Sequence, residues 1–173
     1  MKSRMVWFIA AALVAAGVIA YLLSARTPFE KVPPAAGDIA PEIGLADVYG
    51  AMVDLSAFRD QVVVVFFWAS WCGPCKDQLA MFEKAYRELA DRGFAVIAIA
   101  TDDVSRETAD KMGLTFPVVR ANDRVSAAYG HINSVPATFV IGRDRIILRK
   151  HNNYYDEKSL RSEIDSALRA NMN

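Results

Sequence analysis

Cysteine and histidine are both scarce in this 173-residue sequence, which has two of each. Two cysteines cannot form the disulfide framework of a small secreted scaffold. An excess of charge of either sign is also lacking, because 20 Lys and Arg residues balance 20 Asp and Glu residues. Without a basic surplus, the composition gives no indication of nucleic acid as a partner. Hydrophobic residues make up 53% of the chain, enough for a core that needs no stabilising disulfides or metal ions.

Both cysteines lie in the stretch WASWCGPCKDQ, as Cys72 and Cys75. They fit a structural disulfide, half of a metal site, or a reversible redox pair. A disulfide that closes so short a loop removes little entropy from the unfolded chain, which argues against the first explanation. A zinc site needs two more ligands, and His131 and His151 stand in separate segments without zinc-type spacing. We therefore expect no metal ion, and no other cofactor.

The residues on either side of the cysteine pair predict a strand followed by a helix. Residues 62–67, VVVVFF, are typical of a central strand that is buried on both faces. After Pro74, apolar residues recur at helical spacing: Leu79, Phe82, Tyr86 and Leu89. Cys72 is then at the helix N-terminus, where free N–H groups and the macrodipole stabilise a thiolate. Cys75 is one turn further on, so the spacing favours attack on a disulfide by Cys72 and resolution by Cys75.

The rest of the chain predicts further strands and helices. We expect a hairpin around Tyr49-Gly50 and a second buried strand at 94–100. The other expected elements are helices around 104–112 and 123–129, strands at 137–141 and 145–149, and a last helix at 157–169. This order predicts an α/β sandwich around a mixed sheet.

The N-terminal end predicts a membrane anchor. Residues 5–23 form a run of 19 uncharged residues. A helix of this length spans about 28 Å, close to the ~30 Å hydrocarbon core of a bilayer. A cleaved signal peptide is the alternative, but the run is long for one and the exit YLLSAR is a poor cleavage site. Positive charges on its two sides favour an inward N-terminus only slightly, which would leave the catalytic domain outside.

The segment after the anchor is rich in proline. Residues 24–41 hold four of the seven prolines, which favours an extended tether over a folded element. The sequence thus divides into an anchor at 1–23, a tether at 24–41 and a catalytic domain at 42–173.

The stretch VVVFFWASWCGPCKDQLAMFEKAYREL resembles the active-site segment of the thioredoxin family. The similarity covers roughly residues 37–170 and is greatest to the membrane-anchored TlpA-like or ResA-like thiol-disulfide oxidoreductases. It implies a thioredoxin-like sandwich with a mixed central sheet and an N-terminal hairpin extension. It also implies a cis bond between Val135 and Pro136 beside the cysteine pair, with the backbone of Val135 binding the substrate strand. Trp71 would contribute to an apolar docking surface, although a packing role is equally compatible; Trp68 is expected in the core.

The sequence departs from this family at positions that handle protons. The family often has an acid or Asn where Phe66 stands, and Glu where Gln78 stands. The usual Asp-x-x-Gly turn of the last hairpin is replaced by Gly142-Arg143-Asp144. Asp102 is a candidate substitute as proton acceptor for Cys75. The alternative for Gln78 is a solvated helix residue without a role.

The resemblance implies an enzyme that reduces disulfides of envelope proteins, with clients in cytochrome c maturation and an electron donor that crosses the membrane. It places the chain in a bacterial inner membrane as a single-pass protein, with its catalytic domain in the periplasm or on the outer face. Three alternatives stay open: a docking or chaperone module without turnover, a disulfide oxidase, and an isomerase. A peroxidase is disfavoured, because Cys72 lacks the Thr-x₂-Cys arrangement of peroxiredoxins.

Overall fold

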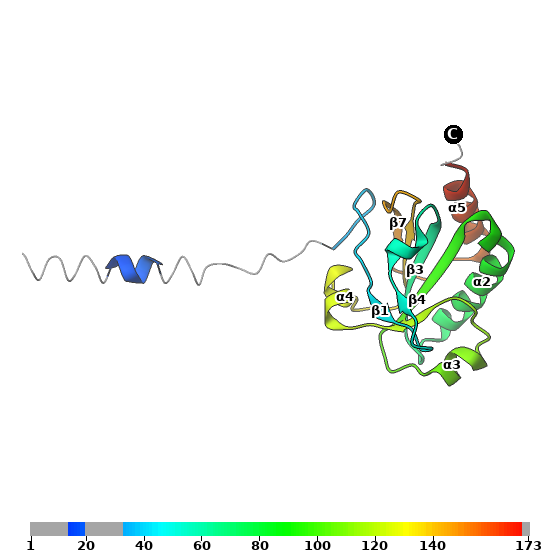
Figure 1. The fold of residues 1–173 in the computed structure, drawn as a ribbon, viewed down its shortest axis with the longest axis horizontal. Helices are drawn as coiled ribbons and strands as arrows, with labels where there is room; N and C mark the ends of the chain where they lie inside the picture. Colours follow the sequence, from blue (N-terminus) through cyan, green and yellow to red (C-terminus); the bar gives the residue numbers. More distant parts are fainter. Residues whose placement is uncertain (1–13, 20–32, 171–173) are drawn as a thin grey trace, which may run out of the picture. The chain divides into compact units, whose positions relative to one another are not determined.

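A five-stranded mixed sheet in the order β5-β4-β3-β6-β7 forms the centre of the fold in the computed structural model, which describes residues 14–19 and 33–170 (Figure 1). The parallel strands β3, β4 and β5 are followed by antiparallel β6 and β7. Their bounds are Val62–Trp68, Phe94–Ala100, Val118–Arg120, Ala137–Ile141 and Ile147–His151. Every residue of β3 and β4 is buried, as expected for strands covered on both faces.

Helices cover both faces of this sheet. Helices α2 and α5 lie on one side and α4 on the other (Figure 1). Alternate side chains of β3 divide accordingly, with Phe66 and Trp68 in one core cluster and Val65 and Phe67 in the other. The helices span Gly73–Leu89 (α2), Arg106–Lys111 (α3), Asp123–Ala128 (α4) and Glu157–Ala170 (α5), and short 3₁₀ turns cover Leu55–Phe58 and Ala90–Arg92. The predicted α/β sandwich with a mixed sheet is confirmed.

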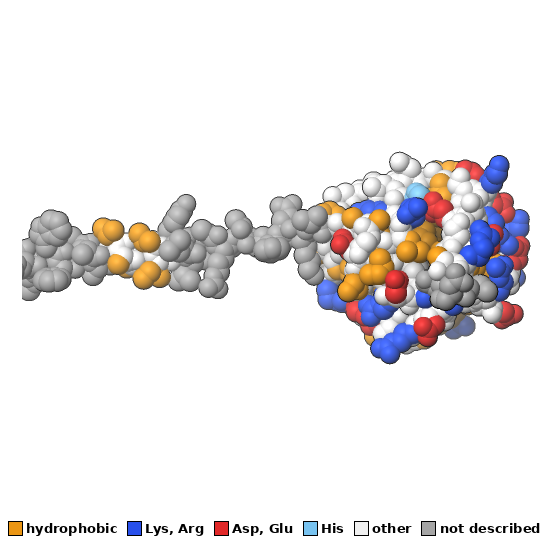
Figure 2. All heavy atoms as spheres, turned by 90° about the horizontal axis from the view of Figure 1, so that it is seen from above, with side chains coloured by type: hydrophobic (Ala, Val, Ile, Leu, Met, Phe, Trp, Pro, Cys, Tyr) orange, Lys and Arg blue, Asp and Glu red, His pale blue; other side chains and the backbone are white. Residues whose placement is uncertain are grey.

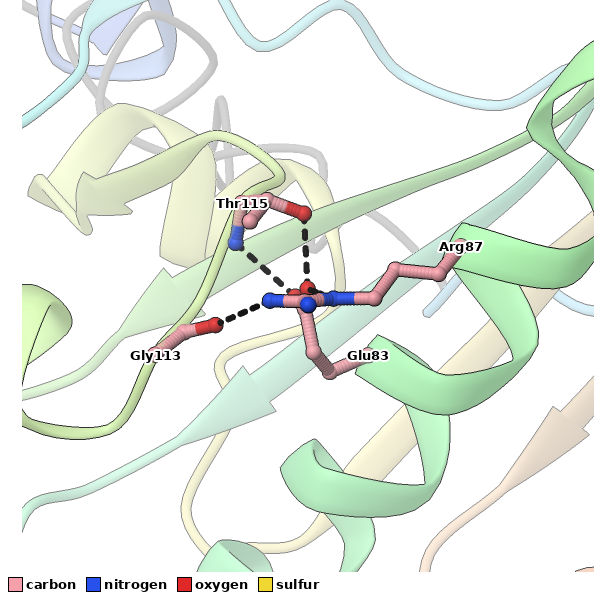
Figure 3. Close-up of polar contacts among 4 residues, drawn as sticks. All are labelled: Glu83, Arg87, Gly113 and Thr115. Atoms are coloured by element: carbon pink, nitrogen blue, oxygen red, sulfur yellow. Dashed lines mark hydrogen bonds and ion pairs between the residues drawn. The ribbon is translucent and has the colours of Figure 1, made fainter.

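A partly buried cluster of polar residues connects α2 to the loop before β5 (Figure 3). The Glu83 carboxylate accepts the N–H of Thr115 at 2.8 Å and its hydroxyl at 2.7 Å. Arg87, one turn along α2, donates to the same carboxylate at 2.6 Å and to the Gly113 carbonyl at 3.3 Å. Because Glu83 is only 8% exposed, these partners offset the loss of its hydration. The cluster therefore fixes the helix that carries the cysteines.

Several predicted bounds need correction. The N-terminal hairpin is reduced to two residues on each side, β1 (Leu45–Ala46) and β2 (Met52–Val53). Strand β7 begins at Ile147 rather than 145, because Arg145 has a left-handed φ of 67° within the turn that closes at Ile146. Strand β5 was not predicted at all, because three residues are too few to show a period.

The second half of the predicted tether is part of the folded domain. Three backbone hydrogen bonds, each 2.9 Å long, join Gly37, Asp38 and Ala40 to the start of β7, with Ile147 as partner of the first two and Arg145 of the third. Ala40 is 1% exposed. The compact unit begins at Pro33, so the predicted domain boundary after residue 41 is wrong. Paired backbone outweighs the preference of proline for free extended chain here, while residues 24–32 lie outside the described part.

Most of the predicted anchor also lies outside the described residues. Within 5–23, only residues 14–19 are described, and they are helical. Among the described residues, we find no helix with the length and apolar character needed to cross a bilayer.

Candidate active site

Cys72 and Cys75 are joined by a disulfide, with 5.3 Å between their Cα atoms. Cys72 is the N-cap of α2, and its Sγ accepts the N–H of Cys75 at 3.3 Å. Cys72 is 6% exposed and Cys75 fully buried. The order of exposure agrees with the assigned roles, because the attacking sulfur must meet a client and the resolving sulfur only needs to reach Cys72.

The first turn of α2 favours negative charge at Cys72. It contains Pro74 and no acidic residue. The free N–H groups of this turn and the helix macrodipole point at the N-cap, where the Cys72 sulfur already accepts one of them. The structure thereby confirms the helix-terminus position predicted for Cys72. The stabilised thiolate expected at such a position stays a prediction.

Sheet topology brings Val135 and Pro136 to the same edge as the cysteine pair. Strands β3 and β6 run antiparallel, with Phe67 opposite Ala137. The residue before β6 therefore lies where β3 ends, at the start of the loop that leads to Cys72. The bond between Val135 and Pro136 is cis, as the resemblance implied. Pro136 is buried, whereas Val135 is half-buried.

The two tryptophans of the loop have opposite environments. Trp71 is 75% exposed, next to Cys72. A packing role for Trp71 is therefore wrong, and a large apolar side chain in solvent beside the reactive sulfur is suited to contact with a client. Trp68 is fully buried, as predicted.

Gln78 is a buried residue, not a solvated one. It is 0% exposed, and neither its Nε2 nor its Oε1 has a hydrogen-bond partner among the described residues. It lies three residues after Cys75 on the same face of α2. Phe66 is also fully buried, with its ring 5.0 Å from that of Phe82. Neither side chain can accept a proton from Cys75, which agrees with the departure noted in the sequence.

Asp102 lies on the loop side of the site and binds Ser70, a residue that the sequence did not single out. The N–H of Ser70 donates to the two Asp102 carboxylate oxygens at 3.1 and 3.0 Å, and its hydroxyl donates at 2.5 Å. Among the described residues, no hydrogen bond joins Asp102 to Cys75; the hydrogen bonds of its carboxylate go to Ser70, in the loop before Cys72. No local signal marks Ser70, because this contact follows from the pairing of β3 with β4.

The histidines of the metal alternative lie apart from the cysteines. His131 is exposed after α4, and His151, in β7, contacts Glu163 of α5 at 2.9 Å. Within the part of the chain that the structure describes, no group of three or more His, Cys, Asp or Glu residues is placed to hold a metal ion.

Comparison with known proteins agrees with this geometry. The sequence profile of the AhpC/TSA family matches residues 36–150. The chain belongs to the AhpC/TSA family. The thiol-disulfide oxidoreductase ResA of Geobacillus kaustophilus (strain HTA426) is 30% identical to this chain over 147 residues. The aligned part covers 83% of this chain and 84% of ResA. The thioredoxin-like protein YneN of Bacillus subtilis (strain 168) is 28% identical over 135 residues, or 75% of this chain and 78% of YneN.

Solved structures of this AhpC/TSA-type fold include a thiol:disulfide interchange protein, DsbE, of Chlorobium tepidum. It superposes with a TM-score of 0.72 at 28% identity, covering 78% of this chain and 99% of that one. Peroxidoxin BcpB of Mycobacterium tuberculosis gives a TM-score of 0.65 at 22% identity over 81% of this chain and 99% of its own, which shows a shared fold alone. The resemblance to ResA-like proteins is therefore confirmed, and the chain is a thiol-disulfide oxidoreductase of the ResA and DsbE type.

Proposed function

We propose that this protein reduces disulfides of client proteins on the outer side of a bacterial inner membrane, with Cys72 as nucleophile and Cys75 as resolving thiol. The observation that carries the proposal is the position of Cys72 as N-cap of α2, with its sulfur accepting the N–H of a fully buried Cys75. This arrangement supports a reversible redox pair in which one sulfur is presented and the other is shielded.

The exchange takes place in two balanced steps. The Cys72 thiolate attacks one client sulfur, a mixed disulfide forms, and the other client sulfur leaves as a thiolate that takes a proton from solvent. The Cys75 thiol gives up its proton and attacks the Cys72 sulfur, so the Cys72–Cys75 disulfide forms and the second client thiolate leaves. Two electrons pass from the enzyme dithiol to the client disulfide.

When a helix N-terminus lowers the pKa of a thiol, the thiol gains more as a leaving group than as a nucleophile. A shift from about 8.5 to about 7 raises the thiolate fraction at pH 7.5 from roughly 9% to roughly 76%. The intrinsic nucleophilicity falls about fivefold over the same shift, so the net gain in attack is less than about twofold. The larger effects are on Cys72 as a leaving group and on the reduction potential of the pair.

Reduction is favoured over oxidation by the Gly-Pro pair between the cysteines, which matches strongly reducing thioredoxins. An oxidising envelope does not keep such a dithiol reduced, so the proposal includes an electron donor that crosses the membrane. Haem-binding Cys-x-x-Cys-His thiols of cytochromes c are the proposed clients, because they must be reduced before haem attachment. Residues 5–23 would hold the enzyme at the membrane as an uncleaved anchor.

The visible surface of the catalytic domain suits protein clients better than nucleic acid. Figure 2 shows Lys and Arg side chains interspersed with Asp and Glu side chains on that face. The net charge of zero fits this mixture. A nucleic acid partner would instead favour a continuous basic stripe. Trp71 supplies an apolar contact beside the reactive sulfur.

Reduction of insulin disulfides with a small thiol donor tests the activity. The full-length chain in detergent should turn over, and Cys72→Ser should abolish turnover. A docking or chaperone module would bind clients without turnover, and turnover equal to that of the Cys72→Ser variant would overturn the proposal. Consumption of a hydroperoxide by the same preparation would instead favour a peroxidase, which lacks support here because Ala69 occupies the Thr position of Thr-x₂-Cys.

Trapping with Cys75→Ser identifies the client, because the mixed disulfide on Cys72 is then not resolved. Cytochrome c apoproteins are expected among the trapped proteins, and their absence would remove that part of the proposal. The N-terminus of the mature protein and protease access in spheroplasts test the anchor and the orientation. A product that starts near Arg26, or a domain that is protected by an intact inner membrane, would contradict one of the two.

A further inference from the structure

The loop before Cys72 is a tight turn that carries an exposed tryptophan at one of its two central positions. The N–H of Cys72 donates to the Ala69 carbonyl at 3.1 Å, so Ser70 and Trp71 are the two central residues of a four-residue turn. Trp71 is 75% exposed there. An apolar ring in solvent contributes little to holding the turn together. The position of Trp71, and the path of the turn that leads to Cys72 at the start of α2, thus depend on what holds Ser70.

The end of the neighbouring strand holds the first half of this turn. Trp68 and Ala100 are partners in the parallel pairing of β3 and β4, so the residues after each strand lie side by side. Thr101 donates its N–H and its hydroxyl to the Trp68 carbonyl at 2.8 and 3.1 Å. Asp102 follows at once and accepts from Ser70.

The hydrogen bonds that Thr101 and Asp102 make to Trp68 and Ser70 are here called the clamp. Asp102 provides its charged partner. Its carboxylate accepts both the backbone N–H and the hydroxyl of Ser70, at distances of 2.5 to 3.1 Å. Hydrogen bonds to a charged acceptor are about twice as strong as neutral ones, and here they meet in a half-buried position. Because two donors on one residue are held, both the backbone and the side chain of Ser70 are fixed.

The next residue provides a natural comparison. Asp103 carries the same charge one position along, but its carboxylate pairs with Arg120 at 2.5 Å, and its side chain is 87% exposed. It does not reach the turn through any described hydrogen bond. The two aspartates therefore separate the effect of a hydrogen-bonded clamp from the effect of a nearby negative charge.

We propose that Asp102 is a positioning residue for the attack by Cys72, and that it acts through Ser70 on the turn that presents Trp71 and the reactive sulfur. Thiol-disulfide exchange needs a defined approach of the attacking sulfur along the client disulfide. Without these hydrogen bonds, the turn samples other conformations, and the observed rate is the parent rate multiplied by the fraction of molecules in the competent conformation. This inference rests on the proposed function only for the identity of the client.

The test compares full-length Asp102→Asn with Asp103→Asn, both in a Cys75→Ser background and in detergent. Two measurements are made from pH 5 to 9: the thiolate absorbance of Cys72, and the rate of mixed-disulfide formation with a small aromatic disulfide and with a disulfide-bonded peptide. Above the pKa of Cys72, the rate with the peptide should fall about tenfold in Asp102→Asn and stay within about twofold of the parent in Asp103→Asn. The loss should be larger for the peptide, because the peptide also contacts Trp71.

Ser70 gives a second route to the same answer if Asp102→Asn does not fold. Ser70→Ala removes only the hydroxyl contact and should slow the reaction about threefold, whereas Ser70→Thr keeps the hydroxyl and should match the parent. The Ser70→Ala and Asp102→Asn effects should be less than multiplicative when combined, since they act on one contact.

Three results would overturn the proposal: equal plateau rates in parent and Asp102→Asn, equal loss in the two aspartate variants, or a loss that a shifted Cys72 pKa explains fully. In the last case Asp102 would act as a charge and not as a clamp. Insulin turnover by the unmodified protein tests the proposed function separately, because the ratio between variant and parent with a small disulfide does not depend on it.

Discussion

Glu83 of α2 and Thr115 of the loop before β5 are joined by two hydrogen bonds, although 32 residues separate them in the chain. Desolvation opposes ionisation of Glu83, but the hydrogen bonds from Thr115 and the contact with Arg87 outweigh it and hold the pKa of this carboxyl below its ordinary value. The ionised carboxylate therefore stabilises the fold and keeps the helix that bears the cysteines in place.

Glu83→Gln should lower the free energy of unfolding by about 1–3 kcal/mol, because the amide replaces a charged acceptor of three hydrogen bonds in a buried site. Chemical denaturation at pH 7 measures the change. Glu107→Gln is the matched control, since Glu107 and its partner Lys111 are both 74% exposed and such pairs contribute little. Equal effects of the two substitutions would contradict the role given to Glu83.

The stabilisation by Glu83 should depend on pH with a definite sign. Because the folded-state pKa is lowered, the contribution is fully present above the unfolded-state pKa and is lost as pH falls through the folded-state pKa. The difference in unfolding free energy between the parent and Glu83→Gln should therefore shrink on acidification below about pH 4. A difference that stays constant from pH 7 to pH 3 would show that the carboxylate charge is not involved.

Gln78→Glu should speed the release of a client from a preformed Cys72 mixed disulfide near neutral pH. A carboxylate three residues after the buried Cys75 can take its proton, an effect typically worth about 10²-fold when the base is well placed. Single-turnover release kinetics measure it. Gln78→Met is the control, because it keeps the length without a base and should release at the parent rate. If Gln78→Glu shows the parent rate and pH profile, Gln78 is not near the path of the proton.

The same substitution should make stability fall with rising pH. Burial raises the pKa of a carboxyl group, so the folded state of Gln78→Glu holds its proton longer than the unfolded state does. The variant is then most stable below the unfolded-state pKa and loses stability as pH rises toward the folded-state pKa. Gln78→Met should be as stable as the parent or more so, because it removes amide atoms without a described partner.

Trp71→Ala should weaken client reduction without unfolding the protein. With 75% of Trp71 exposed, the unfolding free energy should change by less than about 0.5 kcal/mol. The KM for a protein disulfide should rise about tenfold, or about 1.4 kcal/mol, as for an aromatic residue at the centre of a contact. Tyr154→Ala, at an aromatic residue that is 48% exposed in a different loop, is the control. An unchanged KM for insulin would remove Trp71 from the client surface.

Two truncations should locate the start of the folded domain. A chain that begins at residue 33 should keep the melting temperature of the full-length protein. Under the proposed anchoring by residues 5–23, it should also be found in the soluble fraction. A chain that begins at residue 42 should lose about 2–4 kcal/mol, because it lacks three backbone hydrogen bonds to the start of β7 and the 2.8 Å bond from the Tyr129 hydroxyl to the Pro41 carbonyl. Equal stability of the two chains would show that residues 33–41 do not stabilise the domain, and would place its start after residue 41.

Strong apolar patterns predicted the elements that hold the site. The bounds of the strand at 94–100 were predicted to the residue, and those of the strands at 62–68 and 137–141 and of the last helix within one residue or none. These segments bury continuous runs or one regular face, which is a local property of the sequence. Strand β5 and the 3₁₀ turn at Leu55–Phe58 are too short for a period and depend on neighbours that pack against them.

The parts of the site that depend on local sequence motifs were predictable. Cys72 and Cys75 follow from spacing, and burial of Gln78 follows from its helical register with Cys75 and Phe82, a signal that the sequence contained. The contact between Ser70 and Asp102 joins residues 32 positions apart through the register of two parallel strands. No pattern of side chains near either residue encodes that register.

The backbone bonds between Gly37, Asp38 and Ala40 and the start of β7 also decide how the molecule responds to tension. A pull on the chain from its N-terminal side loads these few bonds before any part of the central sheet. They form a short ladder at the outer edge of the domain, so they can open one after another while β3, β4 and the cysteine loop keep their contacts. Under such a pull, we therefore expect this segment to detach before the central sheet and the cysteine loop lose their contacts.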